Sequence, residues 1–103
     1  MEEFKSKLWS KENDMLFDTI LLLENREDCY RFFEDICTVA ELKSIAQRLE
    51  AARLLREGVT YHDISERLGA STATISRVNR SLAYGAEGYT RLLDRLEVRN
   101  KTK

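Results

Sequence analysis

The sequence contains no proline, only four glycines and no long hydrophobic run. All-β domains rely on glycine and proline in their turns, so this scarcity argues against a sandwich or a barrel. No stretch of 18 apolar residues is present, which argues against a transmembrane helix. The start, Met1-Glu-Glu-Phe-Lys5, lacks the basic and apolar regions of a signal peptide. We therefore expect a cytoplasmic all-α protein with no membrane partner.

Cysteine and histidine are also scarce. Cys29 and Cys37 lie eight residues apart, and the single histidine, His62, is far along the chain. A zinc site would need a second Cys/His pair, so we expect no metal site and no cofactor. For the two cysteines, free buried thiols in a reducing compartment are the simpler interpretation, and a redox switch is the alternative.

The residues of an active site are missing as well. His62 is adjacent to Asp63, but neighbouring residues on a helix point about 100° apart and do not face each other. No nucleophile is paired with this histidine, and no glycine-rich phosphate loop is present. We expect no catalytic residues and no enzymatic activity.

Charge is distributed unevenly, although the net charge is only -1. Residues 1–40 carry five basic and ten acidic groups, whereas residues 41–103 carry twelve basic and eight acidic groups. Between Gly69 and Ala83 there are two arginines, Arg77 and Arg80, and no acidic residue. A basic segment on an acidic chain can be the footprint of a polyanion, and scattered surface charge is the alternative.

The chain is predicted to form consecutive short helices within one domain, residues 1–103. Four residues are placed to cap the start of a helix with a side-chain oxygen: Ser10, Asn25, Thr60 and Ser71. Thr38 and Glu41 have the spacing of a capping box, and Gly58 can end the following helix in the left-handed conformation. The predicted segments are 10–58 for the core and dimerisation helices, 60–83 for a helix-turn-helix and 88–99 for a C-terminal helix.

The first two predicted helices are rich in aromatic and aliphatic residues. A small domain buries only about 60–65% of the surface of its unfolded chain, so part of this apolar surface is expected to be covered by a second chain. The alternative is that these helices pack on the domain's own core.

Residues Tyr61–Arg80 have the pattern of a helix-turn-helix. Gly69 supplies the positive φ that the tight turn needs, and the small Ser65 allows the second helix to cross closely. Four apolar residues point inward from the two helices: Ile64, Leu68, Ile75 and Val78. A plain αα-hairpin is the alternative.

The second helix of this motif can enter a DNA major groove. Its solvent face is predicted to hold Ser71, Thr72, Ala73, Ser76, Arg77 and Arg80. Short hydroxyl side chains and alanine let the backbone approach base edges, and methyl groups can contact thymine. The first turn has no arginine, asparagine or glutamine, so water-mediated contacts should contribute to base recognition.

The segment Gly69-Ala-Ser-Thr-Ala-Thr-Ile-Ser-Arg77, preceded by Thr38-Val-Ala-Glu41 and Arg48, resembles the Trp repressor superfamily. The continuation Arg77-Val-Asn-Arg-Ser-Leu82 and the pair Tyr84-Gly85 resemble its YerC/YecD branch. The resemblance covers about residues 35–96. It implies an all-α fold of six helices and an intertwined homodimer in which the N-terminal helices of one chain wrap around the other.

The resemblance also implies a sequence-specific DNA-binding regulator, a repressor, which binds a palindromic operator in double-stranded DNA. The base-contacting positions of the family fall on His62, Ser65, Thr72, Ala73 and Ser76. Its phosphate-contacting positions fall on Tyr61, Asn79 and Arg80. The alternative function is a protein-interaction module that retains the fold without specific DNA binding.

The tryptophan-binding positions of the family fall on Thr38, Arg48, Thr74, Arg77, Val78 and Ser81. The repressor has a glycine where this chain has Val78, and the three added carbons occupy on the order of 60 Å³. Overpacking of ~1–3 kcal/mol would weaken a small ligand about ten- to hundredfold. We therefore expect DNA binding that does not require tryptophan, with any other effector unknown. Arg48 can instead be a surface arginine, and Arg77 can instead contact phosphate.

Overall fold

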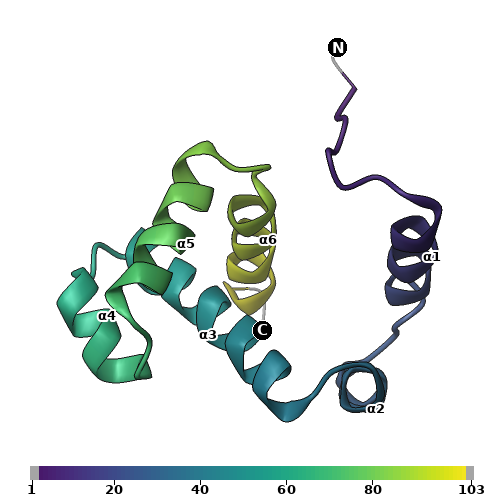
Figure 1. The fold of residues 1–103 in the computed structure, drawn as a ribbon, viewed down its shortest axis with the longest axis horizontal. Coiled ribbons are helices and arrows are strands. Elements are labelled where there is room, and N and C mark those ends of the chain that lie inside the picture. Colours follow the sequence, from purple (N-terminus) through teal and green to yellow (C-terminus); the bar gives the residue numbers. More distant parts are fainter. Residues whose placement is uncertain (1–2, 102–103) are drawn as a thin grey trace. The chain divides into compact units, whose positions relative to one another are not determined.

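The computed structural model describes residues 3–101 as six α-helices, with no β-strand in that range (Figure 1). The helices are α1 (Lys11–Ile20), α2 (Arg26–Ile36), α3 (Val39–Arg56), α4 (Tyr61–Leu68), α5 (Thr72–Tyr84) and α6 (Gly88–Lys101). The predicted all-α class is confirmed. The chain forms two compact units, Met1–Thr38 and Val39–Lys103. Their boundary falls inside the predicted segment 10–58, and the single-domain organisation stays a prediction.

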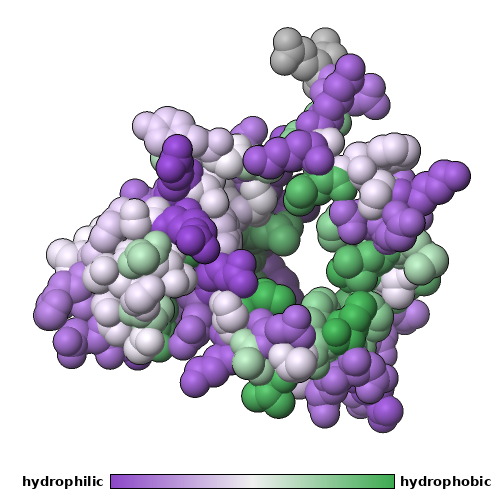
Figure 2. Space-filling model, viewed as in Figure 1, coloured by the Kyte–Doolittle hydropathy of each residue, from purple (hydrophilic) through white to green (hydrophobic). Residues whose placement is uncertain are grey.

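The first unit contains two well-capped helices. As predicted, Ser10 Oγ accepts a hydrogen bond from the Asn13 N–H at 3.0 Å, and Asn25 Oδ1 accepts one from the Asp28 N–H at 2.8 Å. Neither helix has a buried residue. Figure 2 shows green apolar patches at the surface of this unit. The large side chains exposed here are Met15, Phe17, Leu21, Leu22, Tyr30 and Ile36.

The cysteines depart in part from the prediction. Cys29 and Cys37 are both free, but each is only half-buried rather than buried. The physical reason is that α2 belongs to the unit in which neither helix encloses a residue, so no core surrounds the two thiols.

The second unit has a closed core. Helix α3 packs against α4, α5 and α6, and α5 also packs against α4 and α6. Eight residues form the buried cluster: Ala51, Ala52, Leu54, Ile64, Ala70, Ile75, Val78 and Leu93. Ile64 and Ile75 are completely enclosed, which places the centre of the core directly beneath the predicted helix-turn-helix. The inward positions predicted for Ile64, Ile75 and Val78 are confirmed, and Leu68 packs against the cluster.

Helix α3 shows that a periodic apolar pattern need not mark the buried face. The helix ends before Gly58, whose φ is +84°, as predicted. Its buried residues are Ala51, Ala52 and Leu54, all in its second half. Ile45 and Leu49 belong to the same apolar repeat but remain exposed. The N-terminal half of α3 therefore presents apolar side chains to solvent.

Helix α6 is fixed to α3 by one arginine. The Arg56 guanidinium donates hydrogen bonds to the Thr90 carbonyl at 3.2 Å and to Asp94 Oδ1 at 2.5 Å, and it lies 3.8 Å from Glu97 Oε1. The Arg56 side chain is only about one-quarter exposed. Together with buried Leu93, these contacts hold α6 against the unit that carries the helix-turn-helix.

Among residues 3–101, no helix has the length and apolar character needed to cross a membrane. The same residues include no group of three or more His, Cys, Asp or Glu side chains placed to hold a metal ion.

Candidate nucleic-acid interface

The turn between α4 and α5 is built around Gly69. Its φ of +68° lies in the left-handed region, which a residue with a Cβ rarely adopts. The Gly69 N–H donates to the Ser65 carbonyl at 2.9 Å, which ends α4. Ser65 Oγ donates to the Ala70 carbonyl at 2.7 Å. The turn is thus closed by both the backbone and the side chain of Ser65.

The two helices that meet at this turn start at the predicted caps. Thr60 Oγ1 accepts from the Asp63 N–H at 3.2 Å, and Ser71 Oγ accepts from the Thr74 N–H at 3.1 Å. Ser71 Oγ also donates to Thr74 Oγ1 at 3.0 Å. A side-chain cap of this kind fixes the first turn of a helix, where several backbone N–H groups have no intrahelical partner. The start of α5 is therefore held in one conformation.

Gln47 anchors the helix-turn-helix to α3. Its Nε2 donates a hydrogen bond to the Leu68 carbonyl at 2.9 Å, and both residues are partly buried. Leu68 is the last residue of α4, where carbonyl groups lack an intrahelical donor. Gln47 is not among the predicted residues, because it lies 21 positions from Leu68 and nothing in the local pattern links the two.

The predicted DNA-contacting residues all lie on α4, the turn and α5. Nine of the ten are exposed: Tyr61, His62, Ser71, Thr72, Ala73, Ser76, Arg77, Asn79 and Arg80. Ser65 is the exception, because it is half-buried and its hydroxyl proton is engaged by Ala70. Ser65 therefore has a structural role in the turn, and its role in base recognition stays a prediction.

The exposed side of α5 carries positive charge without compensating acids. No acidic residue is present in Thr72–Tyr84. Arg77 and Arg80 are exposed, and neither forms an ion pair or a side-chain hydrogen bond with any residue between 3 and 101. On α4, His62 Nε2 lies 3.9 Å from Glu66 Oε1, and both side chains are well exposed.

Two other arginines of the same unit, Arg53 and Arg56, have acidic partners. Arg53 on α3 hydrogen-bonds Glu50 and Glu57, and the hydrogen bond with Glu50 raises the pKa of its guanidinium. Arg56 is bonded to Asp94 of α6. Arg77 and Arg80 have no such partner and are therefore available for an external anion such as a DNA phosphate.

Comparison with known proteins identifies the family of this chain. The family model for the Trp repressor protein matches residues 11–97, which is most of the chain. The chain belongs to the Trp repressor family. This is a family of DNA-binding regulators and not of enzymes.

Individual members of the Trp repressor family are similar over nearly the whole chain. The uncharacterized protein YerC of Bacillus subtilis (strain 168) is 59% identical over 91 residues, which cover 88% of each chain. A crystal structure of a Trp repressor candidate from Staphylococcus aureus superposes with a TM-score of 0.84 at 55% identity, covering 88% of this chain and 91% of that one. A TrpR-like protein from Eubacterium eligens ATCC 27750 gives a TM-score of 0.85 at 54% identity, covering 88% and 94%.

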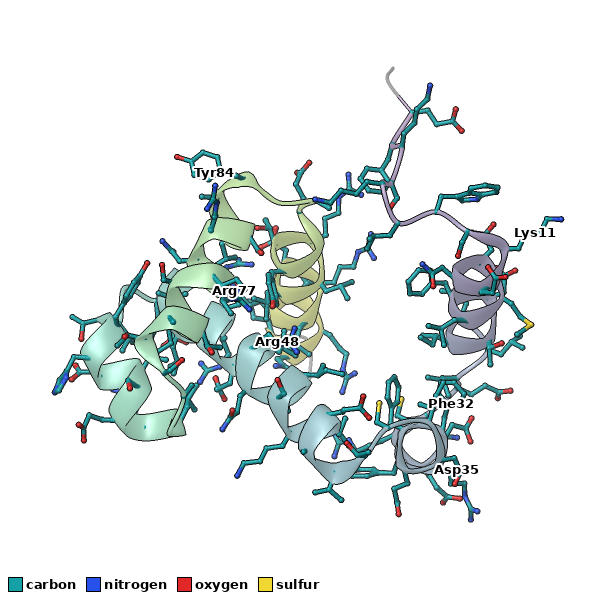
Figure 3. All side chains as sticks on the ribbon, in the orientation of Figure 1. Lys11, Phe32, Asp35, Arg48, Arg77 and Tyr84 are labelled. Atoms are coloured by element: carbon teal, nitrogen blue, oxygen red, sulfur yellow. The ribbon has the colours of Figure 1, made fainter. Side chains whose placement is uncertain are left out.

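The residues predicted to occupy the tryptophan-binding positions lie on two helices and on the segment before α3. Thr38 belongs to the first unit, whereas Arg48 lies on α3 and the rest lie on α5: Thr74, Arg77, Val78 and Ser81. Figure 3 labels Arg48 and Arg77 on these two helices. Arg48 donates a hydrogen bond to Ser44 Oγ at 3.1 Å on its own helix. Val78 is 2% exposed and is part of the core cluster, so its side chain occupies interior space.

Proposed function

We propose that this protein is a sequence-specific DNA-binding transcriptional regulator that acts as a homodimer and represses from a palindromic operator. The main support is the outward face of α5, which carries two unpaired arginines and no acid. A core-anchored turn holds this face in place, with Ile64 and Ile75 enclosed beneath it. A protein with this role needs access to the chromosome, so the proposal includes a cytoplasmic location.

The apolar surface of the first unit supports the homodimer. Leu21 is 80% exposed and Leu22 is 75% exposed, and a soluble monomer rarely leaves a continuous patch of such residues uncovered. The second unit has an open apolar groove between α3 and α6, lined by Leu49, Leu92, Leu93, Arg95, Leu96 and Arg99. A second copy would cover both surfaces. The acidic charge of residues 1–40 also suits Arg95 at the rim of this groove.

Two-fold symmetry gives the proposal a geometric consequence. A homodimer presents two copies of α5, so the operator should be palindromic, with half-sites about one helical turn of DNA apart. Fragments of genomic DNA selected with the purified protein should share such a repeat. A set of bound fragments without a two-fold repeat would contradict the dimeric mode of recognition.

The direct test is fluorescence anisotropy with a selected duplex and a random duplex at several salt concentrations. Arg80→Ala should weaken both complexes equally, because a phosphate contact carries no sequence information. Thr72→Val should change the preference between duplexes, because Thr72 is at the start of α5 where base edges are approached. If the wild-type protein binds neither duplex at low salt, the protein-interaction alternative is favoured instead.

The proposed regulator does not need tryptophan. Val78 fills interior space at the position where the repressor has a glycine, so an indole cannot enter without displacing the core. Isothermal titration of the wild-type protein with L-tryptophan should give no micromolar site. The same titration of Val78→Gly tests the steric argument, because removing ~60 Å³ of side chain should strengthen any residual binding about ten- to hundredfold. A micromolar site in the wild-type protein would contradict this part of the proposal.

A further inference from the structure

The peptide unit that joins Leu68 to Gly69 is held at both of its polar ends. Its N–H, which belongs to Gly69, donates to the Ser65 carbonyl at 2.9 Å. Its carbonyl, which belongs to Leu68, accepts from Gln47 Nε2, also at 2.9 Å. A peptide unit is planar, so two bonds at opposite ends fix the orientation of its plane. The chain turns away from this plane at Gly69, whose φ is +68°, and the plane therefore sets the direction in which α5 begins.

The two carbonyl groups on either side of Gly69 are bound by side chains from different helices. Ser65 Oγ, on α4, donates to the Ala70 carbonyl at 2.7 Å, whereas the donor to the Leu68 carbonyl comes from α3. The Ser65 bond closes the turn, but it moves with α4 if that helix shifts. The Gln47 bond is the one that fixes the turn relative to α3, on which α4 and α5 both pack (Figure 1).

Within residues 3–101, no other hydrogen bond or ion pair joins α3 to α4 or α5. Helix α4 is otherwise held by apolar contacts, and it is short: eight residues with one buried side chain, Ile64. A helix of this length is not stable by itself. Apolar attraction has no preferred direction, whereas a hydrogen bond requires a particular distance and angle. The Gln47 bond is therefore the contact that defines how α4 and the turn are oriented on the core.

The residues expected to contact bases follow this peptide closely. Ser71 and Thr72 are three and four positions after Leu68, and both are exposed. Their side chains are short, so a small displacement of the start of α5 takes them out of hydrogen-bond range of a base edge. Arg77 and Arg80 have long, flexible side chains, which can follow a phosphate through the same displacement. A shift of the turn should thus reduce sequence discrimination more than general affinity for DNA.

We propose that Gln47 is a positioning residue for base recognition. It holds the Leu68–Gly69 peptide, places the start of α5, and in this way raises the discrimination between DNA sequences without contacting DNA. The inference rests on the proposed function and deepens it, because it assigns part of the specificity to a partly buried residue of α3.

The test measures the ratio of the affinities for a selected duplex and a random duplex by fluorescence anisotropy. Gln47→Met keeps the length of the side chain and removes the donor, whereas Gln47→Asn keeps the amide and shortens the side chain by one carbon. Each variant should lower this ratio about three- to tenfold, which corresponds to one lost hydrogen bond. Affinity for the random duplex should remain close to that of the wild type. Simple loss of folded protein would weaken both complexes equally and leave the ratio unchanged.

Leu55→Ala is the matched control. Leu55 is also on α3 and half-buried, and it packs against the core cluster with an apolar side chain. The substitution should lower stability but keep the wild-type ratio of affinities. If Leu55→Ala lowered the ratio as much as the Gln47 variants do, the effect would reflect general destabilisation and the inference would be overturned.

Amide hydrogen exchange of the free protein gives an independent measurement. In Gln47→Met, exchange of the Gly69 N–H should accelerate more than that of the Ile75 N–H, because the turn opens while the core stays closed. Equal acceleration at both sites would overturn the inference. A wild-type ratio of affinities in both Gln47 variants would also overturn it, and would leave the proposed function intact. If the wild-type protein bound no duplex, or bound the selected and random duplexes alike, the proposed function would fail and this inference with it.

Discussion

The two compact units of the chain contrast in how they treat their apolar residues. In Val39–Lys103, eight residues are buried in one cluster and the helix-turn-helix is packed on top of it. In Met1–Thr38, both helices are well capped, yet neither buries a single residue. The second unit thus supplies a core from its own residues, whereas the first displays Leu21 and Leu22 to solvent.

The contrast also extends to charge and to function. The first unit is acidic, and the second contains the basic outward face of α5. Local capping is equally good in both, so helix formation alone does not separate them. What separates them is the presence of partner helices that cover the apolar face. We infer that the second unit carries the DNA-binding surface. The exposed apolar side chains of the first unit would then be buried against another copy of the chain.

The largest expected effect comes from the core of the second unit. Ile75→Ala should lower the free energy of unfolding by about 2–5 kcal/mol, because it leaves a cavity in a completely enclosed position. Chemical denaturation followed by circular dichroism measures the change. Asn79→Ala, at an exposed position of the same helix, is the control and should change it by less than about 0.5 kcal/mol. A similarly small effect of Ile75→Ala would contradict the assigned core.

The next largest effect should appear in the association of the first unit. Leu21→Glu with Leu22→Glu should raise the dissociation constant of the dimer at least about 100-fold, because charged groups would enter an apolar interface. Sedimentation equilibrium measures the constant. Lys11→Glu introduces the same charge at a polar position of α1 and should have little effect. An unchanged dimer in the double variant would show that these leucines are not covered by a second copy.

A smaller effect is expected for the DNA affinity when an exposed residue of α5 is changed. Arg80→Ala should weaken binding to every duplex about tenfold, because one charge-assisted phosphate contact is lost. Binding titrations between low and moderate salt should also show a shallower logarithmic slope. A loss confined to the selected duplex would mean that Arg80 reads bases and does not bind the backbone.

The smallest effects compare the two serine caps, which have nearly equal geometry. Ser71→Ala should cost about 1 kcal/mol of unfolding free energy, because α5 is held in the cooperative core. Ser10→Ala removes the corresponding bond from α1, and its cost should appear mainly as faster amide exchange of α1 rather than as lower global stability. Equal losses of global stability would show that the two units unfold as one.

Much of the candidate interface could be predicted from local pattern. Gly69 in the left-handed conformation, Ser71 as a helix cap, and Ile64 and Ile75 facing inward all depend on residues within a few positions of each other.

Other features depended on the assembled fold. The bond from Gln47 to the Leu68 carbonyl joins residues 21 positions apart. The choice of Ala51 and Leu54 over Ile45 and Leu49 as the buried part of α3 depends on where α4, α5 and α6 meet that helix. The half-burial of Cys29 and Cys37 likewise follows from the lack of a core around α2.

The six helices, the side-chain caps of α1, α2, α4 and α5, and the helix-turn-helix could be predicted from the sequence alone, because these features depend on short-range hydrogen bonds and backbone preferences. The assembled fold decided which apolar residues are enclosed and that Arg56 is paired, because its partner Asp94 lies 38 positions away. Arg53, in contrast, pairs with Glu50 and Glu57 at three and four positions, a spacing that the sequence already contains. Burial requires groups distant in the chain to come into contact, and such contacts leave no trace in local spacing.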